Sequence, residues 1–245
     1  MNKKLRLALL AGIVWSWPFA PVLAADNSAA NAGFVSMFNG KDLTGWEGNP
    51  RLWSVKDGVI TGQTTVDNPA KVNTFLIWTN GTPGDFELRC RFKLRANNDK
   101  GFANSGIQYR SKVLDPANWV VGGYQADMDA GAVYTGTLYE ERMTRATMAF
   151  DGEKVLWDQD CNRKLLGMMG SAAEIQAAVK KEDWNEYVIK AQGNHLQQFI
   201  NGKPTVQVTD DCEAKRAMSG VIALQLHVGP PMMVQYKELQ LKILK

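Results

Sequence analysis

Short segments in which polar and apolar residues alternate recur along most of this chain, and they constrain its fold more than any other feature. Alternation with a period of two gives a segment one apolar and one polar face, as in a half-buried β-strand. Gly, Asn, Asp and Pro separate the segments, and the pairs Asp57-Gly58 and Asn201-Gly202 are typical of tight hairpin turns. The segments expected to form strands read LWSVKDGVITGQ, DFELRCRFKLR, GIQYRSK, GYQADMD, GTLYEER, WNEYVIKAQGNHLQQFINGKPTVQVTD, GVIALQLHV and MVQYKELQLKIL.

One segment, SAAEIQAAVKKEDW, has helical character instead. Ser171 and Glu174 have the spacing of a capping box, and Ile175 and Val179 share one face of the helix that follows. No repeat or low-complexity stretch separates a second domain. Many strands, one short helix and glycine-rich turns predict a single all-β domain over residues 34–245, an antiparallel sandwich or jelly roll.

The first 24 residues have a different character. A basic start, an apolar run and small residues predict a signal peptide over residues 1–24, followed by a flexible N-terminus over 25–33. The protein is then exported, either to a periplasm or outside the cell. An uncleaved membrane anchor is the alternative, and Pro18 and Pro21 argue against it.

Charge and hydropathy limit the partners. Removing the leader lowers Lys plus Arg from 28 to 25 (28 − 3), which equals the 25 Asp plus Glu. A neutral chain without a basic stripe is a poor candidate for binding nucleic acid. No later segment is apolar enough to span a bilayer, so no membrane partner is expected after cleavage. The sequence leaves the oligomeric state open.

The three cysteines divide into two kinds. Cys90 lies on the apolar face of DFELRCRFKLR and is predicted to be a buried thiol. Cys161 and Cys212 lie in polar stretches, where an exported protein could join them in a disulfide. Two free thiols are the alternative, and the sequence does not decide between them.

Five predicted strands carry side chains that bind sugar hydroxyls or titrate on the face opposite their apolar residues. Lys is nearly absent from that face, whereas an ordinary solvated face, the alternative, would more often use Lys, Thr and Ser. Neighbouring carboxylates such as Asp127 and Asp129 can also raise one another's pKa. The polar residues of the five strands are Glu87 and Arg89; Gln108 and Arg110; Gln125, Asp127 and Asp129; Thr137, Tyr139 and Glu141; and Gln225 and His227.

Several motifs together resemble those of the 3-keto-disaccharide hydrolase family, over Phe34 to Leu244 and in the same order. They read SMFNGKDLTGW, WSVKDGVITG, GDFELRCRF, NSGIQYRS, GGYQADMD, WNEYVIKAQGNHLQQFINGK and ALQLHVGPP. The resemblance implies a concanavalin A-like jelly roll of two antiparallel sheets, shared with laminarinase-like glucanases and many lectins. It also implies an exported enzyme that cleaves glycosides oxidised at C3 of the sugar.

The resemblance implies roles for the polar residues. Removal of the C2 proton next to the 3-keto group, followed by β-elimination and hydration, needs a base, an oxyanion stabiliser and an acid. His227 is expected to be the base, Arg110 to stabilise the oxyanion and Asp127 to be the acid, with Asp129 and Glu141 as alternative acids. Asp127 and Asp129 could instead hold a divalent metal ion, and no other cofactor is expected. Substrate binding is expected from Glu87, Gln108, Gln125, Tyr139, Glu141 and Gln225.

Two other functions stay open. The chain could be a lectin-like domain that binds carbohydrate without cleaving it, because tryptophan rings stack on sugars. It could also be an ordinary glycoside hydrolase, but Gln125 stands where glucanases of this fold carry a carboxylate, and an amide cannot act as an ionised nucleophile. The tryptophans available for stacking or for core packing are Trp46, Trp53, Trp78 and Trp119.

Overall fold

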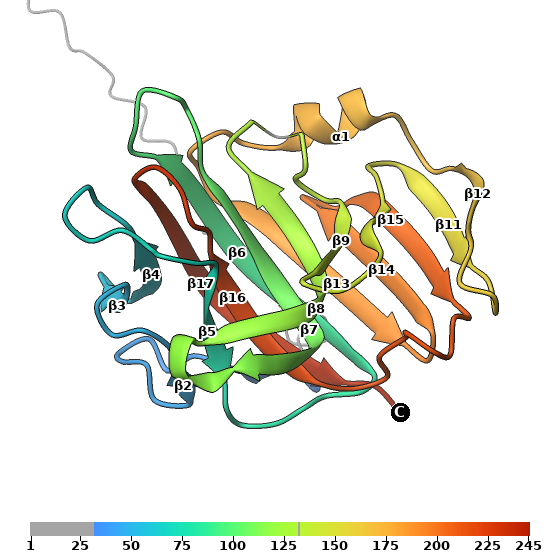
Figure 1. Ribbon diagram of the computed structural model, residues 1–245, viewed down its shortest axis with the longest axis horizontal. Helices are drawn as coiled ribbons and strands as arrows, with labels where there is room; N and C mark the ends of the chain where they lie inside the picture. The colour runs from blue at the N-terminus through green and yellow to red at the C-terminus, as the bar shows by residue number, and fades with distance from the viewer. Residues whose placement is uncertain (1–31, 132) are drawn as a thin grey trace, which may run out of the picture. The chain divides into compact units, whose positions relative to one another are not determined.

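Two β-sheets account for nearly all regular structure in the computed structural model, which describes residues 32–131 and 133–245 (Figure 1). The predicted signal peptide (1–24) lies outside the described residues, as does most of the predicted N-terminal segment (25–33). Residues 33–245 form one unit. The part of the chain that the structure describes has no helix long and apolar enough to cross a membrane.

Sheet A has ten strands and sheet B has seven. Sheet A runs in the order β12 (Arg163–Met168), β11 (Glu153–Trp157), β15 (Lys203–Asp210), β14 (His195–Ile200), β13 (Asn185–Gln192), β6 (Phe86–Ala96), β17 (Met232–Ile243), β4 (Val59–Gln63) and β3 (Trp53–Lys56), with β1 (Val35–Ser36) paired to β17. Sheet B runs in the order β10 (Ala146–Ala149), β9 (Leu138–Glu141), β8 (Val120–Asp129), β7 (Asn104–Asp115), β16 (Val221–Leu226), β5 (Thr74–Trp78) and β2 (Trp46–Glu47). The predicted pair of antiparallel sheets is confirmed, except that β11 and β15 pair in parallel.

Two short helical elements interrupt the strands. The helix α1 (Ala172–Ala178) begins with the predicted capping box, in which Ser171 accepts from the Glu174 amide and the Glu174 carboxylate accepts from the Ser171 amide. A 3-10 turn, η1 (Pro116–Asn118), forms the tip of the β7–β8 hairpin. The disulfide between Cys161 and Cys212 is present, and Cys90 is a buried thiol.

The core lies between the sheets, and the predicted alternation selects what enters it. On β6 the side chains of Phe86, Leu88 and Cys90 are buried in it, and on β8 those of Tyr124 and Met128. Polar residues on the two sheets therefore point away from the core in opposite directions.

This arrangement corrects the expectation for Glu87. Its strand, β6, belongs to sheet A, so its side chain lies on the opposite side of the sandwich from the polar residues of sheet B. There Glu87 forms ion pairs with Arg89 at 2.7 Å and with Lys190 at 3.4 Å. The structure does not bring Glu87 to the other predicted substrate-binding residues.

The distal half of the β7–β8 hairpin folds across the outer face of sheet B (Figure 1). A β-bulge bends it, because Arg110 and Ser111 together oppose the single residue Gly123. Beyond the bend, Val121 packs on outward-facing apolar side chains of β5 and β16, and Phe75 of β5 donates its backbone N–H to Trp119 at 2.9 Å. The hairpin tip is thereby fixed beside the edge of β5.

Candidate functional site

A cluster of polar side chains lies on the outer face of sheet B. The polar cluster, as we call it, consists of Gln108, Gln125, Asp127, Tyr139, Glu141 and Gln225, from β7, β8, β9 and β16. Gln108 is in register with Gln125, and Gln125 with Tyr139, so these three lie side by side across three strands. All six were predicted to share a face, and the structure brings them together.

A directional chain of hydrogen bonds orients the amides in the polar cluster. Ser111 donates its hydroxyl to Gln108 Oε1 at 2.7 Å, and Gln108 Nε2 donates to Gln125 Oε1 at 2.6 Å. Gln125 Nε2 then donates to Asp127 Oδ1 at 3.2 Å. This chain of hydrogen bonds has room only because residue 106 is a glycine, since a Cβ at Gly106 would lie 2.5 Å from Gln125 Cγ. The amides are therefore held in one orientation, with Asp127 as the last acceptor.

Asp127 is the group whose protonation this arrangement controls. Burial raises the pKa of its carboxyl well above the ordinary 3.8, and the charges of Asp129 and Glu141 raise it further. The hydrogen bonds from Met128 N and Gln125 act in the opposite direction and do not cancel the effect of burial. Both of those bonds go to Oδ1, whereas Oδ2 bonds no other described residue. Asp127 can therefore hold a proton on an oxygen that the protein leaves free.

Glu141, in register with Gly123 on β8, is held by amide donors. Asn73 Nδ2 donates to Glu141 Oε1 at 3.1 Å, and Gln225 Nε2 lies 3.5 Å from Oε2. Burial raises the pKa of Tyr139, and the charges of Glu141 and Asp127 raise it further. Gln225 Oε1 is buried and has no hydrogen-bond partner among the described residues.

Asn73 also connects the polar cluster to His227. Its Oδ1 accepts from the backbone N–H of Val228 at 3.0 Å, while its Nδ2 donates to Glu141. No sequence pattern predicts this role, because Asn73 lies in the loop before β5. A loop amide between two predicted strands carries no periodic signal.

His227 follows the end of β16 on the side of that strand opposite Leu226, which is buried in the core. Its Nδ1 lies 2.5 Å from the carbonyl oxygen of Val228, and its ring packs edge-on against Phe102. A carbonyl oxygen can only accept, so this contact requires Nδ1 to carry the proton. In the neutral ring Nε2 then has a free lone pair, as a general base needs.

Asp129 has a structural task at the end of β8. Its Oδ1 accepts from the backbone N–H groups of Tyr134 and Thr135 and from the Thr135 hydroxyl, which fixes the loop that follows. Among the described residues, no group of three or more His, Cys, Asp and Glu side chains is arranged to hold a metal ion. A cation at Asp127 and Asp129 would therefore have no third His, Cys, Asp or Glu ligand among the described residues, and that site stays a prediction.

Arg110 does not point into the polar cluster, although the alternation predicted that it would. At the bulge its backbone has φ +46°, and its side chain leaves the polar face. The guanidinium is buried and donates to the carbonyl oxygens of Gly84, Gly193 and Ala217 and to Asp85 at 2.9 Å. These contacts use four of the five guanidinium N–H groups and connect three loops, so the guanidinium is committed away from the cluster.

The fold and the polar face define a jelly-roll domain, and solved structures share this architecture. A proposed glycosyl hydrolase from Parabacteroides distasonis ATCC 8503 is 17% identical, with a TM-score of 0.56, and the match covers 86% of this chain and 99% of that one. A second from the same organism is 19% identical, with a TM-score of 0.54, and covers 91% and 99%. The carbohydrate-binding module CBM66 from Bacillus subtilis is 11% identical, with a TM-score of 0.52, and covers 81% and 95%. These likenesses establish the fold.

The family follows from the sequence itself. Residues 33–242 match the model of the 3-keto-alpha-glucoside-1,2-lyase-like domain, and the chain belongs to that family. The predicted resemblance is thereby confirmed, and the chain is a carbohydrate-active domain. No curated protein matches the sequence.

Proposed function

We propose that this protein cleaves 3-keto-glycosides by removing the C2 proton and eliminating the C1 substituent. The observation that carries the proposal is the pairing of chemistries on one face: Asp127, whose raised pKa favours a protonated carboxyl, and His227, whose Nε2 is left as a free base. Family membership supports the 3-keto substrate. Asp127 can supply the acid, and His227 Nε2 the lone pair, that elimination needs.

The reaction starts at C2, where the neighbouring ketone acidifies the proton. His227 Nε2 takes that proton, and the electron pair forms an enediolate with its negative charge on the C3 oxygen. The enediolate then collapses. The ketone at C3 re-forms, a double bond forms between C1 and C2, and the C1–O bond breaks. Asp127 gives its proton to the departing oxygen. Water adds at C1 and a proton returns to C2, so that the net result is hydrolysis.

The enediolate needs hydrogen-bond donors, and the polar cluster offers neutral ones. Tyr139 keeps its phenolic proton, because burial and the nearby carboxylates raise its pKa. Gln108, Gln125 and Gln225 present amide groups whose orientation the surrounding hydrogen bonds fix. Preorganised neutral donors stabilise a developing oxyanion without requiring a fixed cation. We therefore assign this role to the cluster and not to Arg110.

Two variants separate the steps. His227→Gln should abolish both cleavage of a 3-keto-disaccharide and exchange of its C2 hydrogen with deuterated solvent, both followed by NMR. Asp127→Asn should slow cleavage by about 10²- to 10⁴-fold while C2 exchange continues, because the base remains and only the proton for the leaving group is lost. Asp67→Asn, an exposed substitution, is the control and should behave as wild type.

The pH profile supplies a second test with a definite sign. Asp127 must be protonated to act, so wild-type cleavage should fall as pH rises through its raised pKa, and Asp127→Asn should lack this alkaline decline. If wild-type protein binds the 3-keto sugar but shows neither exchange nor product, the proposal fails. A carbohydrate-binding domain without catalysis would then be the better description.

We also propose that the protein works outside the cytoplasm, in a periplasm or the extracellular medium. The Cys161–Cys212 disulfide supports this location, because disulfides persist in oxidising compartments. Detecting the mature N-terminus after export, at residue 25, would test it.

A further inference from the structure

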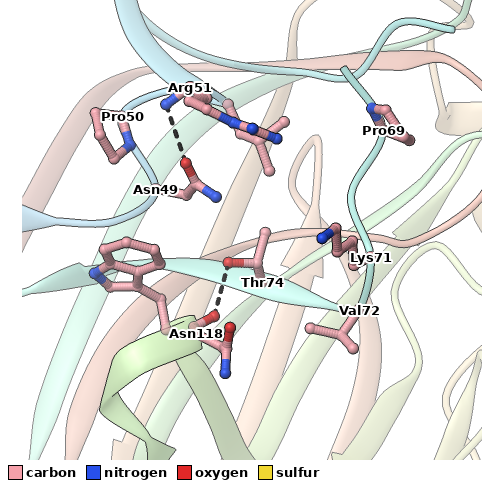
Figure 2. A pocket seen from close by; sticks show the side chains of 10 residues that line it. Asn49, Pro50, Arg51, Pro69, Lys71, Val72, Thr74 and Asn118 are labelled. Carbon is pink, nitrogen blue, oxygen red and sulfur yellow. Dashed lines mark hydrogen bonds between the residues drawn. The ribbon is translucent and has the colours of Figure 1, made fainter. Parts of the chain in front are cut away.

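A pocket lies beside the hairpin tip, and its chemistry differs from that of the polar cluster (Figure 2). Its volume is about 420 Å³, within the range of small-molecule sites. It is bounded by the tip of the β7–β8 hairpin, the start of β5, the loop that precedes β3 and the loop that follows β4. Its lining residues are Asn49, Pro50, Arg51, Leu52, Pro69, Lys71, Val72, Thr74, Asn118 and Trp119.

The charge of this pocket is one-sided. Arg51 and Lys71 are both exposed, neither forms an ion pair with another described residue, and no carboxylate lines the wall. The acid nearest along the hairpin tip, Asp115, is occupied by the N–H groups of Ala117 and Asn118. Two cations without a protein counter-ion make the pocket attractive to an anion.

Further donors and a flat wall complete the pocket. Asn49 accepts the Arg51 backbone N–H at 3.0 Å through Oδ1, so its amide nitrogen is left to donate. Figure 2 shows this nitrogen and the Lys71 amino group directed toward the interior of the pocket. The half-buried Trp119 forms part of the wall, and the hydrogen bond from Phe75 N to Trp119 O fixes its backbone. Charged donors beside an aromatic ring suit a sugar that carries an anionic group.

The pocket adjoins the polar cluster through one segment of chain. Val72 and Thr74 line the pocket, whereas Asn73 between them bonds Glu141 in the cluster. A ligand that occupies both places would lie along this segment, with its reacting ring at Asp127 and its far end at Lys71.

We propose that this pocket is a subsite for an anionic sugar unit, a carboxylate- or phosphate-bearing pyranose, at the leaving-group end of the substrate. The link to the leaving group rests on the function proposed above, whereas the binding of an anionic sugar does not. Arg51 and Lys71 bind the anionic group, Asn49 binds a hydroxyl or carboxylate oxygen, and Trp119 contacts the ring.

Binding can be measured without any turnover. Methyl glucuronide and glucose 6-phosphate, titrated by calorimetry, should each bind more tightly than methyl glucoside, and the affinity should fall as NaCl is raised. Lys71→Gln and Arg51→Gln should each weaken binding of the two anionic probes by about 5- to 10-fold, since each removes one charged donor. Lys100→Gln removes an exposed charge elsewhere and should have no effect.

Activity distinguishes failure of this proposal from failure of the proposed function. Lys71→Gln and Arg51→Gln should raise KM for a 3-keto-disaccharide whose leaving group is a uronic acid by a larger factor than KM for a neutral one. Equal binding of methyl glucoside and methyl glucuronide, or binding of inorganic phosphate as tight as that of glucose 6-phosphate, would overturn the subsite even in an active enzyme. Selective binding by an inactive protein would instead support the subsite and overturn the catalytic proposal.

Discussion

Replacing Asp151 by asparagine should remove much of the pH dependence of this protein's stability near neutrality. Asp151 lies in the loop between β10 and β11, it is 5% exposed, and neither of its carboxylate oxygens has a hydrogen-bond partner among the described residues. Its Oδ1 lies so close to Gly136 that a Cβ there would be 3.0 Å away. Burial, with a contribution from the charge of Asp129, raises the pKa of Asp151 from 3.8 to about 7.

The sign and size follow from that pKa. The folded state binds the proton of Asp151 more tightly than the unfolded state does. The stability that this proton contributes is therefore fully present below about pH 4 and is lost progressively between about pH 4 and pH 7. Each pKa unit corresponds to about 1.4 kcal/mol, so ionised Asp151 destabilises the fold by up to about 4 kcal/mol. For a domain of this size, about 1 kcal/mol shifts Tm by about 2–4 °C.

The assay is a series of thermal or guanidinium unfolding curves from about pH 5 to pH 8. Between about pH 5 and pH 7 the Tm of wild type should fall relative to that of Asp151→Asn by about 5–10 °C, and above pH 7 the two curves should run parallel. The test compares the slopes of Tm against pH and not the absolute Tm values. The amide introduced by Asp151→Asn would itself carry unpaired polar groups and so shift Tm at every pH. Asp67→Asn, at an exposed position, controls for the loss of one negative charge. Parallel curves for wild type and Asp151→Asn over the whole range would refute the reasoning and show that the carboxylate is stabilised in its charged form.

Two further predictions concern stability. Arg110→Leu should lower the free energy of unfolding by about 3–5 kcal/mol in guanidinium titrations, because it leaves Asp85 and three carbonyl oxygens without their buried donor; unchanged stability with lost activity would return Arg110 to the catalytic site. Replacing Cys161 and Cys212 by serine should destabilise the fold by about 4 kcal/mol, from a closed loop with a sequence separation of 51 residues. Thiol titration of unfolded, unreduced wild type should find one free thiol, and three would contradict the disulfide.

Alternation predicted the polar cluster because a strand's two faces are set by local geometry alone. Gln125, Asp127 and Tyr139 lie together for this reason, and the same rule placed Phe86 and Leu88 in the core. It failed at Arg110, where one extra residue in the strand reverses the faces. The pair Gly122-Gly123 opposite the bulge is the only local sign of the bend, and a glycine pair has many other uses.

Other errors have a longer-range origin. The strand that carries Glu87 has the same pattern as those of sheet B, and only the pairing of β6 with β13 and β17 places it in the other sheet. Strand pairing depends on contacts between distant segments, which periodicity does not encode. The disulfide also joins distant segments, and the structure settles the alternative of two free thiols. Asn73 and Asp151 lie in loops, where periodicity gives no signal.

The composition of the polar cluster bears on which cleavage chemistry this face can perform. A glycosidase that works through two carboxylates needs both of them free to flank the bond. Here Gln125 takes the first position and donates to Asp127, while Glu141 is held by Asn73 and Gln225. Three buried glutamines and the half-buried Tyr139 beside the protonatable carboxyl of Asp127 supply many neutral donors and a single acid. Elimination from a ketone needs that combination, because negative charge develops on oxygen and only the leaving group requires a proton.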